Sequence, residues 1–116
     1  MSNIGTEYLF LCRDNYLRGI TPSNNQNYSN PNYVRIIEIA QEYFAGSKID
    51  EYKNFFQEYQ YLVNLWTAHM ILEHGNPDSE LKAECIEIIM RYTNSHSTEL
   101  ANQEKQWLLN NRYFIQ

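Results

Sequence analysis

Residues 69–75, read as HMILEHG, hold the densest set of side chains that could do chemistry, because two histidines and a glutamate fall within six residues. Zinc-binding helices place ligands four residues apart, since that spacing brings side chains onto one face. His69 and His74 are five apart, which separates them by about 140° around a helix. His69 and Glu73 share a face, but two ligands do not complete a tetrahedral site. The spacing argues against a zinc site, and we expect no metal or other cofactor.

Other catalytic arrangements are equally hard to find in the sequence. Cys85 lies in an apolar helical stripe, unlike the electropositive helix start that activates a thiolate. No GxSxG elbow, P-loop or glycine-rich phosphate turn occurs. The glutamates at positions 80, 84 and 87 share a polar helix face, which is typical of a solvated surface. We therefore predict a binding protein and not an enzyme. An enzyme or metal-binding helical domain that uses His69, Glu73 and Glu84 is the rival from another class.

Composition and charge narrow the possible partners. The 116 residues fit a single domain, residues 1–116, and 43% are hydrophobic, which is enough for a core. The formal charge of −5 opposes contact with a phosphate backbone, so we expect a basic protein as partner and no direct binding to nucleic acid.

Cys12 and Cys85 form no CxxC pair, which is typical of reduced, buried thiols. No segment resembles a signal peptide or a membrane span, so we expect a cytoplasmic monomer without membrane contact.

Apolar residues recur at helical spacing through most of the chain, whereas alternating strand patterns and hairpin turns are missing. The pattern predicts an all-α fold of five or six helices. The first expected elements are a helix over 6–18 that ends at Gly19, a flexible polar loop over 21–32, and a helix that is capped by Asn32 and ends at Gly46. A third helix follows, capped by Ser47 or Asp50, with a break between residues 57 and 60. The last three expected helices are one over 61–74 that ends at Gly75, one capped by Asp78 or Ser79, and one over 99–111.

Each predicted helix has an apolar face that we expect to point inward. In chain order these faces are Leu9, Cys12, Tyr16 and Leu17; Val34, Ile37, Ala40 or Gln41, and Phe44; Tyr52, Phe55, Phe56 and Tyr59; Leu62, Leu65, Trp66, His69 or Met70, and Leu72; Leu81, Cys85, Ile88, Ile89 and Tyr92; Leu100, Trp107 and Leu108. We expect His69 to pack beside Trp66, and His74 to interact with the negative end of its helix.

Residues 61–95, YLVNLWTAHMILEHGNPDSELKAECIEIIMRYTNS, resemble a HEAT-type α-hairpin repeat. The matching features are Ala68 and Leu72 before Gly75, the turn Asn76-Pro77-Asp78, and the pair Leu81-Lys82 that opens the second helix. Cys85 stands where the family prefers alanine, a mild departure because cysteine is also small and apolar. The resemblance implies a short HEAT-like α-superhelix of α-hairpins, to which residues 33–59 and 99–111 could add degenerate flanking halves.

HEAT-like units present a rigid surface to a partner, and the size, acidity and repeat form of this chain are similar to those of bacterial immunity proteins from contact-dependent inhibition and other polymorphic toxin systems. The resemblance implies a protein that binds one cognate toxin domain, a basic RNase or DNase, and blocks its active site. Carboxylates would mimic phosphates and tyrosines would anchor the contact. The alternative is a phage, mobile-element or host adaptor. The candidate contact residues are Glu51, Glu58, Glu80, Glu84, Glu87, Arg91, Tyr28, Tyr52 and Tyr59.

Overall fold

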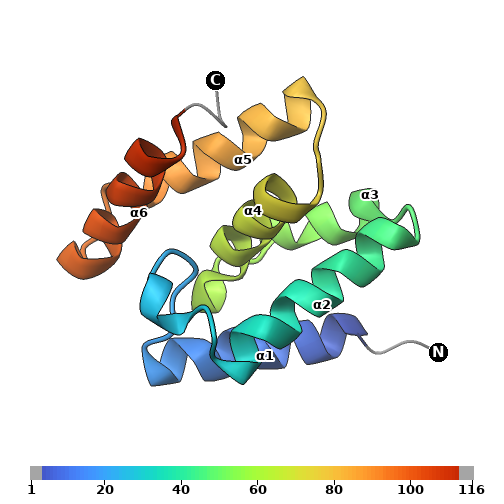
Figure 1. The fold of residues 1–116 in the computed structure, drawn as a ribbon, viewed down its shortest axis with the longest axis horizontal. Helices are drawn as coiled ribbons and strands as arrows, with labels where there is room; N and C mark the ends of the chain where they lie inside the picture. Colours follow the sequence, from blue (N-terminus) through green and yellow to red (C-terminus); the bar gives the residue numbers. More distant parts are fainter. Residues whose placement is uncertain (1–3, 113–116) are drawn as a thin grey trace.

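Helix α4 (Val63–His74) lies at the centre of the computed structural model, which describes residues 4–112, and the other helices surround it (Figure 1). In chain order the other elements are α1 (Ile4–Arg18), the 3-10 turn η1 (Asn25–Asn27), α2 (Pro31–Ala45), α3 (Ile49–Tyr52), the 3-10 turns η2 (Lys53–Gln57) and η3 (Gln60–Leu62), α5 (Ser79–Tyr92) and α6 (Thr98–Asn110). None of residues 4–112 forms a strand. The predicted all-α fold of five or six helices is confirmed.

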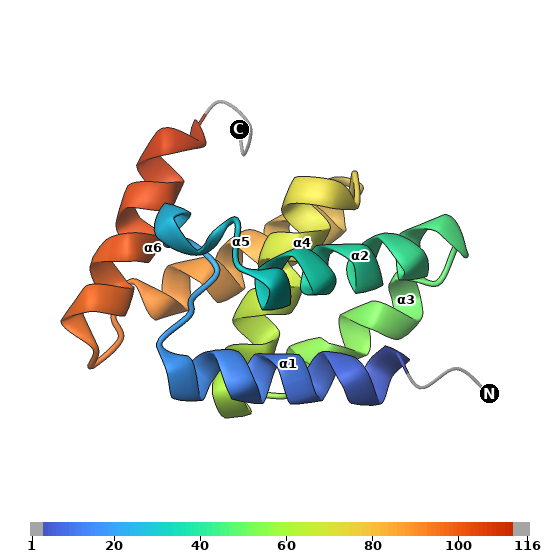
Figure 2. The same cartoon turned by 60° about the horizontal axis from the view of Figure 1, so that its bottom comes forward.

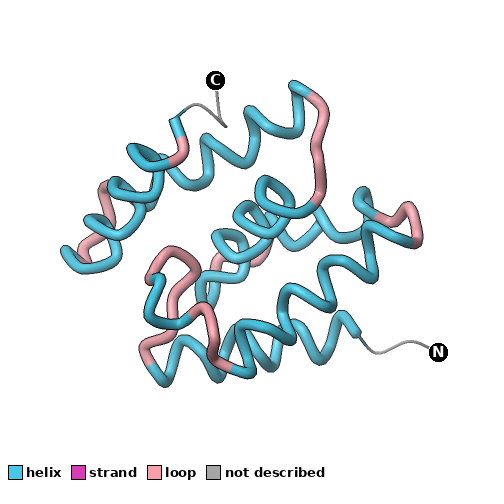
Figure 3. The backbone as a smooth tube through the Cα atoms, viewed as in Figure 1, coloured by secondary structure: helices cyan, strands magenta, loops and turns pink. Residues whose placement is uncertain are grey.

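The outer helices cover α4 from different sides. Helices α1 and α2 lie side by side and both contact α4, whereas α5 contacts α4 more extensively than any other element does (Figure 2). Helix α6 packs on α5. The segment between α1 and α2 is mostly loop and is interrupted by the turn η1 (Figure 3). Among the described helices, none has both the length and the apolar composition that crossing a bilayer requires.

Helix α4 is buried around its whole circumference. Every residue from Val63 to Leu72 is buried, including three polar ones. Each of these side chains finds a partner on a different element. Asn64 Oδ1 accepts a 2.6 Å hydrogen bond from Tyr92 of α5, Thr67 Oγ1 lies 2.8 Å from the hydroxyl of Tyr8 on α1, and His69 Nε2 lies 2.6 Å from Glu104 Oε1 on α6. A buried polar group without a partner is costly, so these three contacts fix how the outer helices are placed.

The inward faces of α1 and α2 differ from the prediction. On α1 the buried residues are Tyr8, Cys12 and Asn15, while Leu9, Tyr16 and Leu17 are exposed, so three of the four predicted core positions were wrong. Helix α1 turns this way because the ring of Tyr8 packs against Tyr52 and Phe55 while its hydroxyl meets Thr67. The prediction used only the positions of apolar residues, so it missed an inward face that includes a tyrosine and an asparagine.

Helix α2, like α1, is rotated relative to the prediction, so that the residues just before the predicted positions point inward. Its buried residues are Tyr33, Ile36, Ile39, Ala40 and Tyr43, so Ala40 was predicted correctly. Val34 is exposed, and Ile37 and Phe44 are only half-buried. Tyrosine rings account for the rotation, since Tyr33 packs on Trp66 and Tyr43 packs on Tyr52.

In the later elements the predicted faces largely agree with the structure. The predicted core residues of α5 and α6 are buried or half-buried, as are those of the 61–74 segment. The exception is Tyr59, which was expected inside and is 65% exposed. It lies in the predicted break, which the structure places after η2 at residues 58–59.

Helix ends follow the predicted chemistry at some places and depart from it at others. Asp78 caps α5 by accepting a hydrogen bond from the Leu81 amide, and Gly75 ends α4, both as predicted. Helix α2 is capped by Asn30 with Pro31 at its first position, not by Asn32. A proline with its fixed φ suits the first turn, so the loop is two residues shorter than expected.

At the end of α2, the residue in the left-handed conformation is not the glycine that ends the helix. Gly46 is the cap with φ −87°, and Ser47 takes φ +56° instead. The Lys48 amide donates to Tyr43 O at 2.8 Å and the Ser47 amide donates to Phe44 O at 3.1 Å, which is the hydrogen-bond pattern of a Schellman motif. Ser47 therefore closes α2 and does not cap α3, whose first turn has no side-chain cap.

Replacing Ser47 with glycine is expected to stabilise the fold, because glycine adopts positive φ without the Cβ penalty. The free energy of unfolding, measured by urea denaturation, should rise by about 0.5 to 1 kcal/mol. Ser47→Val is the matched opposite, since a β-branched residue tolerates this conformation poorly. Equal stabilities of the two variants would contradict the left-handed turn.

Candidate functional site

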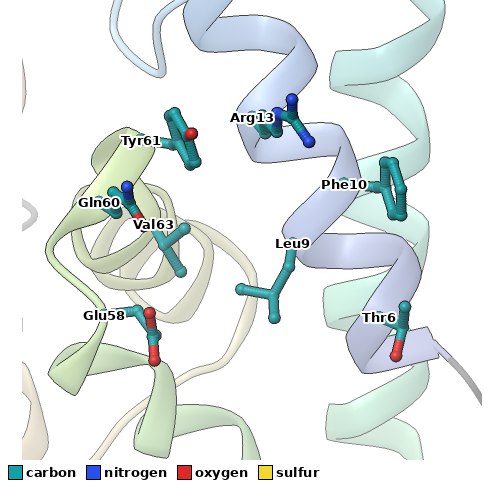
Figure 4. A pocket seen from close by; sticks show the side chains of 8 residues that line it. All are labelled: Thr6, Leu9, Phe10, Arg13, Glu58, Gln60, Tyr61 and Val63. Atoms are coloured by element: carbon teal, nitrogen blue, oxygen red, sulfur yellow. The ribbon is translucent and has the colours of Figure 1, made fainter.

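A groove of about 310 Å³ lies between α1 and residues 58–63 (Figure 4). Leu9 and Val63 face each other across it, while Tyr61 and Arg13 lie at one end and Glu58 lies at the other. The remaining lining residues are Thr6, Phe10 and Gln60. An apolar floor with charged groups at its rim is the usual form of a site that receives an apolar side chain from another molecule. We name this feature the α1 groove.

Apolar side chains continue from the α1 groove along the outer face of α1. The exposed fractions are 37% for Leu9, 66% for Phe10, 53% for Tyr16 and 68% for Leu17. Single exposed apolar residues are common, but four large ones on a single helix form a patch of the kind that marks interaction sites. Leu9 and Phe10 also line the α1 groove, so groove and patch form one surface.

The wall of the groove opposite α1 is a strained turn. Tyr61 has φ +56° and Leu62 has φ +60°, two successive residues other than glycine in the left-handed region. Each such residue costs on the order of 1–3 kcal/mol, and conformations of this kind cluster at functional sites. The Asn64 amide closes the turn by donating to Glu58 O at 2.9 Å. The turn places Tyr61 edge-on against Tyr16 of α1, with ring centroids 5.6 Å apart.

Four of the predicted contact residues lie next to this turn or on the nearby end of α5. Glu58 lines the α1 groove, and the neighbouring Tyr59 is exposed. The phenol of Tyr59 is close enough to Arg91 to interact electrostatically with it. Arg91 pairs with Glu87 at 2.7 Å, and both side chains are exposed. These four residues remain candidates for a contact surface.

The other predicted contact residues are scattered. Glu80 and Glu84 line a second groove of about 300 Å³ between α3 and the α4–α5 turn, together with Asp50, Asp78 and Lys53. Glu51 is exposed on α3. Tyr28 is 43% exposed and lies in the loop before α2, beside α6.

The prediction that Tyr52 contacts a partner was wrong. It has no exposed surface, and its ring packs against Tyr8, Tyr43 and Phe44. A residue at the centre of an aromatic cluster cannot touch a partner, so Tyr52 belongs to the core.

His69, from the segment that first suggested chemistry, lies in a buried network. Its Nε2 is 2.6 Å from Glu104 Oε1 and 3.0 Å from Ser23 Oγ, and its Nδ1 is 3.1 Å from Glu73 Oε2. Its ring packs edge-on against Trp107, with centroids 4.6 Å apart, while the predicted neighbour Trp66 packs against Tyr33. His69 thus joins α4, α6 and the loop before α2.

Electrostatics keep His69 charged in this network. Burial alone would lower its pKa, but Glu104 and Glu73 outweigh that effect and raise the pKa to about 9. A charged imidazole with both nitrogens engaged has no lone pair for a metal or a proton from a substrate. In residues 4–112, no group of three or more histidines, cysteines, aspartates and glutamates is arranged to hold a metal ion.

The two cysteines are buried and free, as predicted. Burial raises the pKa of Cys85 to about 12 and raises the pKa of Cys12 further. Both are therefore protonated at neutral pH and are poor nucleophiles.

No family model, curated protein or solved structure matches the chain. The likeness of residues 61–95 to a HEAT-type hairpin therefore stays a prediction.

The α1 groove was not predicted from the sequence, although a signal was present. Leu9, Phe10, Cys12, Tyr16 and Leu17 cover more of the helix circumference than one inward face can hold.

The charge on His69 predicts how stability depends on pH. Because its pKa of about 9 in the folded state lies above the ordinary histidine value of 6.5, the folded state holds an extra proton between these pH values. The stabilisation is complete below about pH 6.5 and is lost as the pH rises through about 9, by about 3 kcal/mol in all. Urea unfolding between pH 6 and 10 measures this loss.

His69→Gln supplies the control, because it removes the titrating group and should flatten the curve in this window. NMR titration of the His69 ring gives the midpoint directly. A midpoint at or below pH 6.5 would show that the carboxylates do not hold the proton.

Proposed function

We propose that this protein is a binding domain that receives an apolar side chain of a partner protein in the α1 groove. The observation that carries the proposal is the outward apolar surface of Leu9, Phe10, Tyr16 and Leu17 beside the groove. Covering one such side chain contributes about 1.5–3 kcal/mol. A few covered residues of this kind supply most of the binding energy in protein interfaces.

The charge of the chain indicates what kind of partner fits. With a net charge of −5, the protein attracts a basic partner and repels an acidic one. Glu80 and Glu84 add to the negative field beside Asp50 at the second groove. Fields of this kind act at long range and accelerate encounter, while the apolar groove makes the short-range contact.

Our proposal for the partner is a bacterial toxin domain that the protein neutralises in the cytoplasm. It rests on the resemblance of residues 61–95 to a HEAT-type hairpin and on the likeness in size and charge to immunity proteins. The rival is an adaptor that uses the same groove for a partner without toxicity. Co-expression with the product of the adjacent gene separates the two, because only an immunity protein restores growth.

Phe10→Asp is expected to weaken binding to this gene product at least about 30-fold, as loss of a hot spot worth about 2 kcal/mol would. The reason is that a carboxylate cannot enter an apolar contact without losing its hydration. Isothermal titration calorimetry measures the affinity, and growth of the co-expressing cells measures protection.

Leu109→Asp is the matched control for Phe10→Asp. Leu109 is similarly exposed, at 62%, but lies on α6 and does not line the α1 groove. Both variants should melt within a few degrees of the parent protein, because both sites are on the surface. Equal loss of binding in the two variants would rule out the α1 groove as the contact.

Charge reversal tests the basic partner separately. Glu80→Lys combined with Glu84→Lys should slow association and reduce its dependence on salt, with a smaller effect on dissociation. Stopped-flow or surface-plasmon kinetics at low and high salt measure this. An unchanged association rate at low salt would contradict long-range attraction by this surface.

A further inference from the structure

A third groove, of about 840 Å³, runs between residues 23–28 and α6. None of the residues that line it belongs to the α1 groove. Eight of its thirteen lining residues are asparagine or glutamine, including Asn24 and Gln26 on one wall and Gln103 and Gln106 on the other. Amide groups donate and accept hydrogen bonds but carry no charge, so the other lining residues set the charge of the groove. We name this feature the amide groove.

The charge of the amide groove is negative. Glu73 and Glu99 line it, and none of the described residues along its walls is a lysine or an arginine. Behind the wall, His69 Nε2 contacts both Ser23, which lines the groove, and Glu104. Two carboxylates, those of Glu73 and Glu104, therefore contact one imidazolium. Glu99 adds a third carboxylate to the lining of the groove, so carboxylates outnumber the imidazolium in this region.

One of these acceptors is left over inside the protein. Glu104 has no exposed surface, and its Oε2 atom has no hydrogen-bond partner in the described structure. Buried carboxylate oxygens are normally satisfied. The unpaired oxygen adds negative potential where the amide groove meets the His69 network.

An aromatic ring lies at the same place. Tyr28 lines the groove, is 43% exposed, and is held by packing against Tyr33 with ring centroids 5.1 Å apart. Burial raises the pKa of the Tyr28 phenol, and Glu73 and Glu104 raise it further, so the ring lies within the field of both carboxylates. A ring face beside a carboxylate favours cations.

We propose that the amide groove binds an organic cation, a guanidinium or ammonium group, between the carboxylate of Glu73 and the ring of Tyr28. Other amides along the walls, among them those of Asn25 and Asn102, can bind the polar remainder of the ligand. Anionic ligands are repelled. The cation has two possible sources, a free small molecule or the arginine or lysine side chain of a polypeptide, and the chemistry of recognition is the same for both.

The test is an NMR titration of the full chain with N-acetyl-arginine amide, whose only charge is the guanidinium. The two tryptophans make the readout specific, because Trp107 lines the amide groove and Trp66 is buried in the core. The Trp107 indole signal should shift saturably, with a dissociation constant on the order of millimolar, while the Trp66 signal stays in place. N-acetyl-citrulline amide, a neutral molecule of nearly the same shape, should bind at least about tenfold more weakly.

Variants locate the binding to this groove. Glu99→Gln and Glu73→Gln should each weaken binding, and Glu99→Gln does so without touching His69. Glu84→Gln, on α5 outside the amide groove, is the matched control and should bind like the parent protein. Spermidine and a Gly-Arg-Gly peptide with blocked ends then distinguish the sources, because the tighter ligand identifies the preferred one.

Two outcomes would overturn the proposal. The first is an equal shift with the citrulline compound, which would show a polar site that does not respond to charge. The second is the absence of a saturable Trp107 shift with all three cations. Failure here leaves the α1 groove untouched, since the two grooves share no residue.

Discussion

Helix α4 is buried on all sides, and this burial determines how the other helices are placed around it. A helix that lacks a solvent-facing side must satisfy Asn64, Thr67 and His69 inside the protein. The three partners come from α5, α1 and α6, which lie far apart in the chain. Apolar packing alone would allow these helices to rotate or slide, whereas a hydrogen bond to one atom permits a single arrangement. The polar residues of α4 therefore decide which faces of its neighbours point outward.

The α1 groove is a consequence of that constraint. Because the hydroxyl of Tyr8 must meet Thr67, α1 turns Tyr8 and Asn15 inward and leaves Phe10 and Leu17 in solvent. A helix free to minimise exposed apolar surface would turn the other way. The strained turn at Tyr61 forms the opposite wall, and this cost also acts against folding. Two unfavourable features on one surface are what a binding site selected for contact would show.

Features that depend on local chemistry could be predicted from the sequence, whereas features that depend on distant partners could not. The helices, the cap at Asp78 and the break before α4 follow from residues close in the chain. The orientation of α1 depends on Thr67, 59 residues beyond Tyr8, and the burial of His69 depends on Glu104, 35 residues away. Neither pairing leaves a trace in periodicity. Sequence spacing alone could argue against a zinc site at His69 but could not show which carboxylates hold its proton.

Compared with well-packed apolar residues in the same positions, the ion pair between His69 and Glu104 contributes more to the specificity of the fold than to its stability. Removing two charges from water costs about as much as their attraction returns, and the unpaired Oε2 of Glu104 adds to that cost. Well-packed apolar residues in both positions would hold α6 at least as firmly. They would not fix its rotation, which aligns Gln103 with Thr21 and Trp107 with His69. The amide groove exists only in that rotation, because its walls are α6 and the loop that carries Thr21.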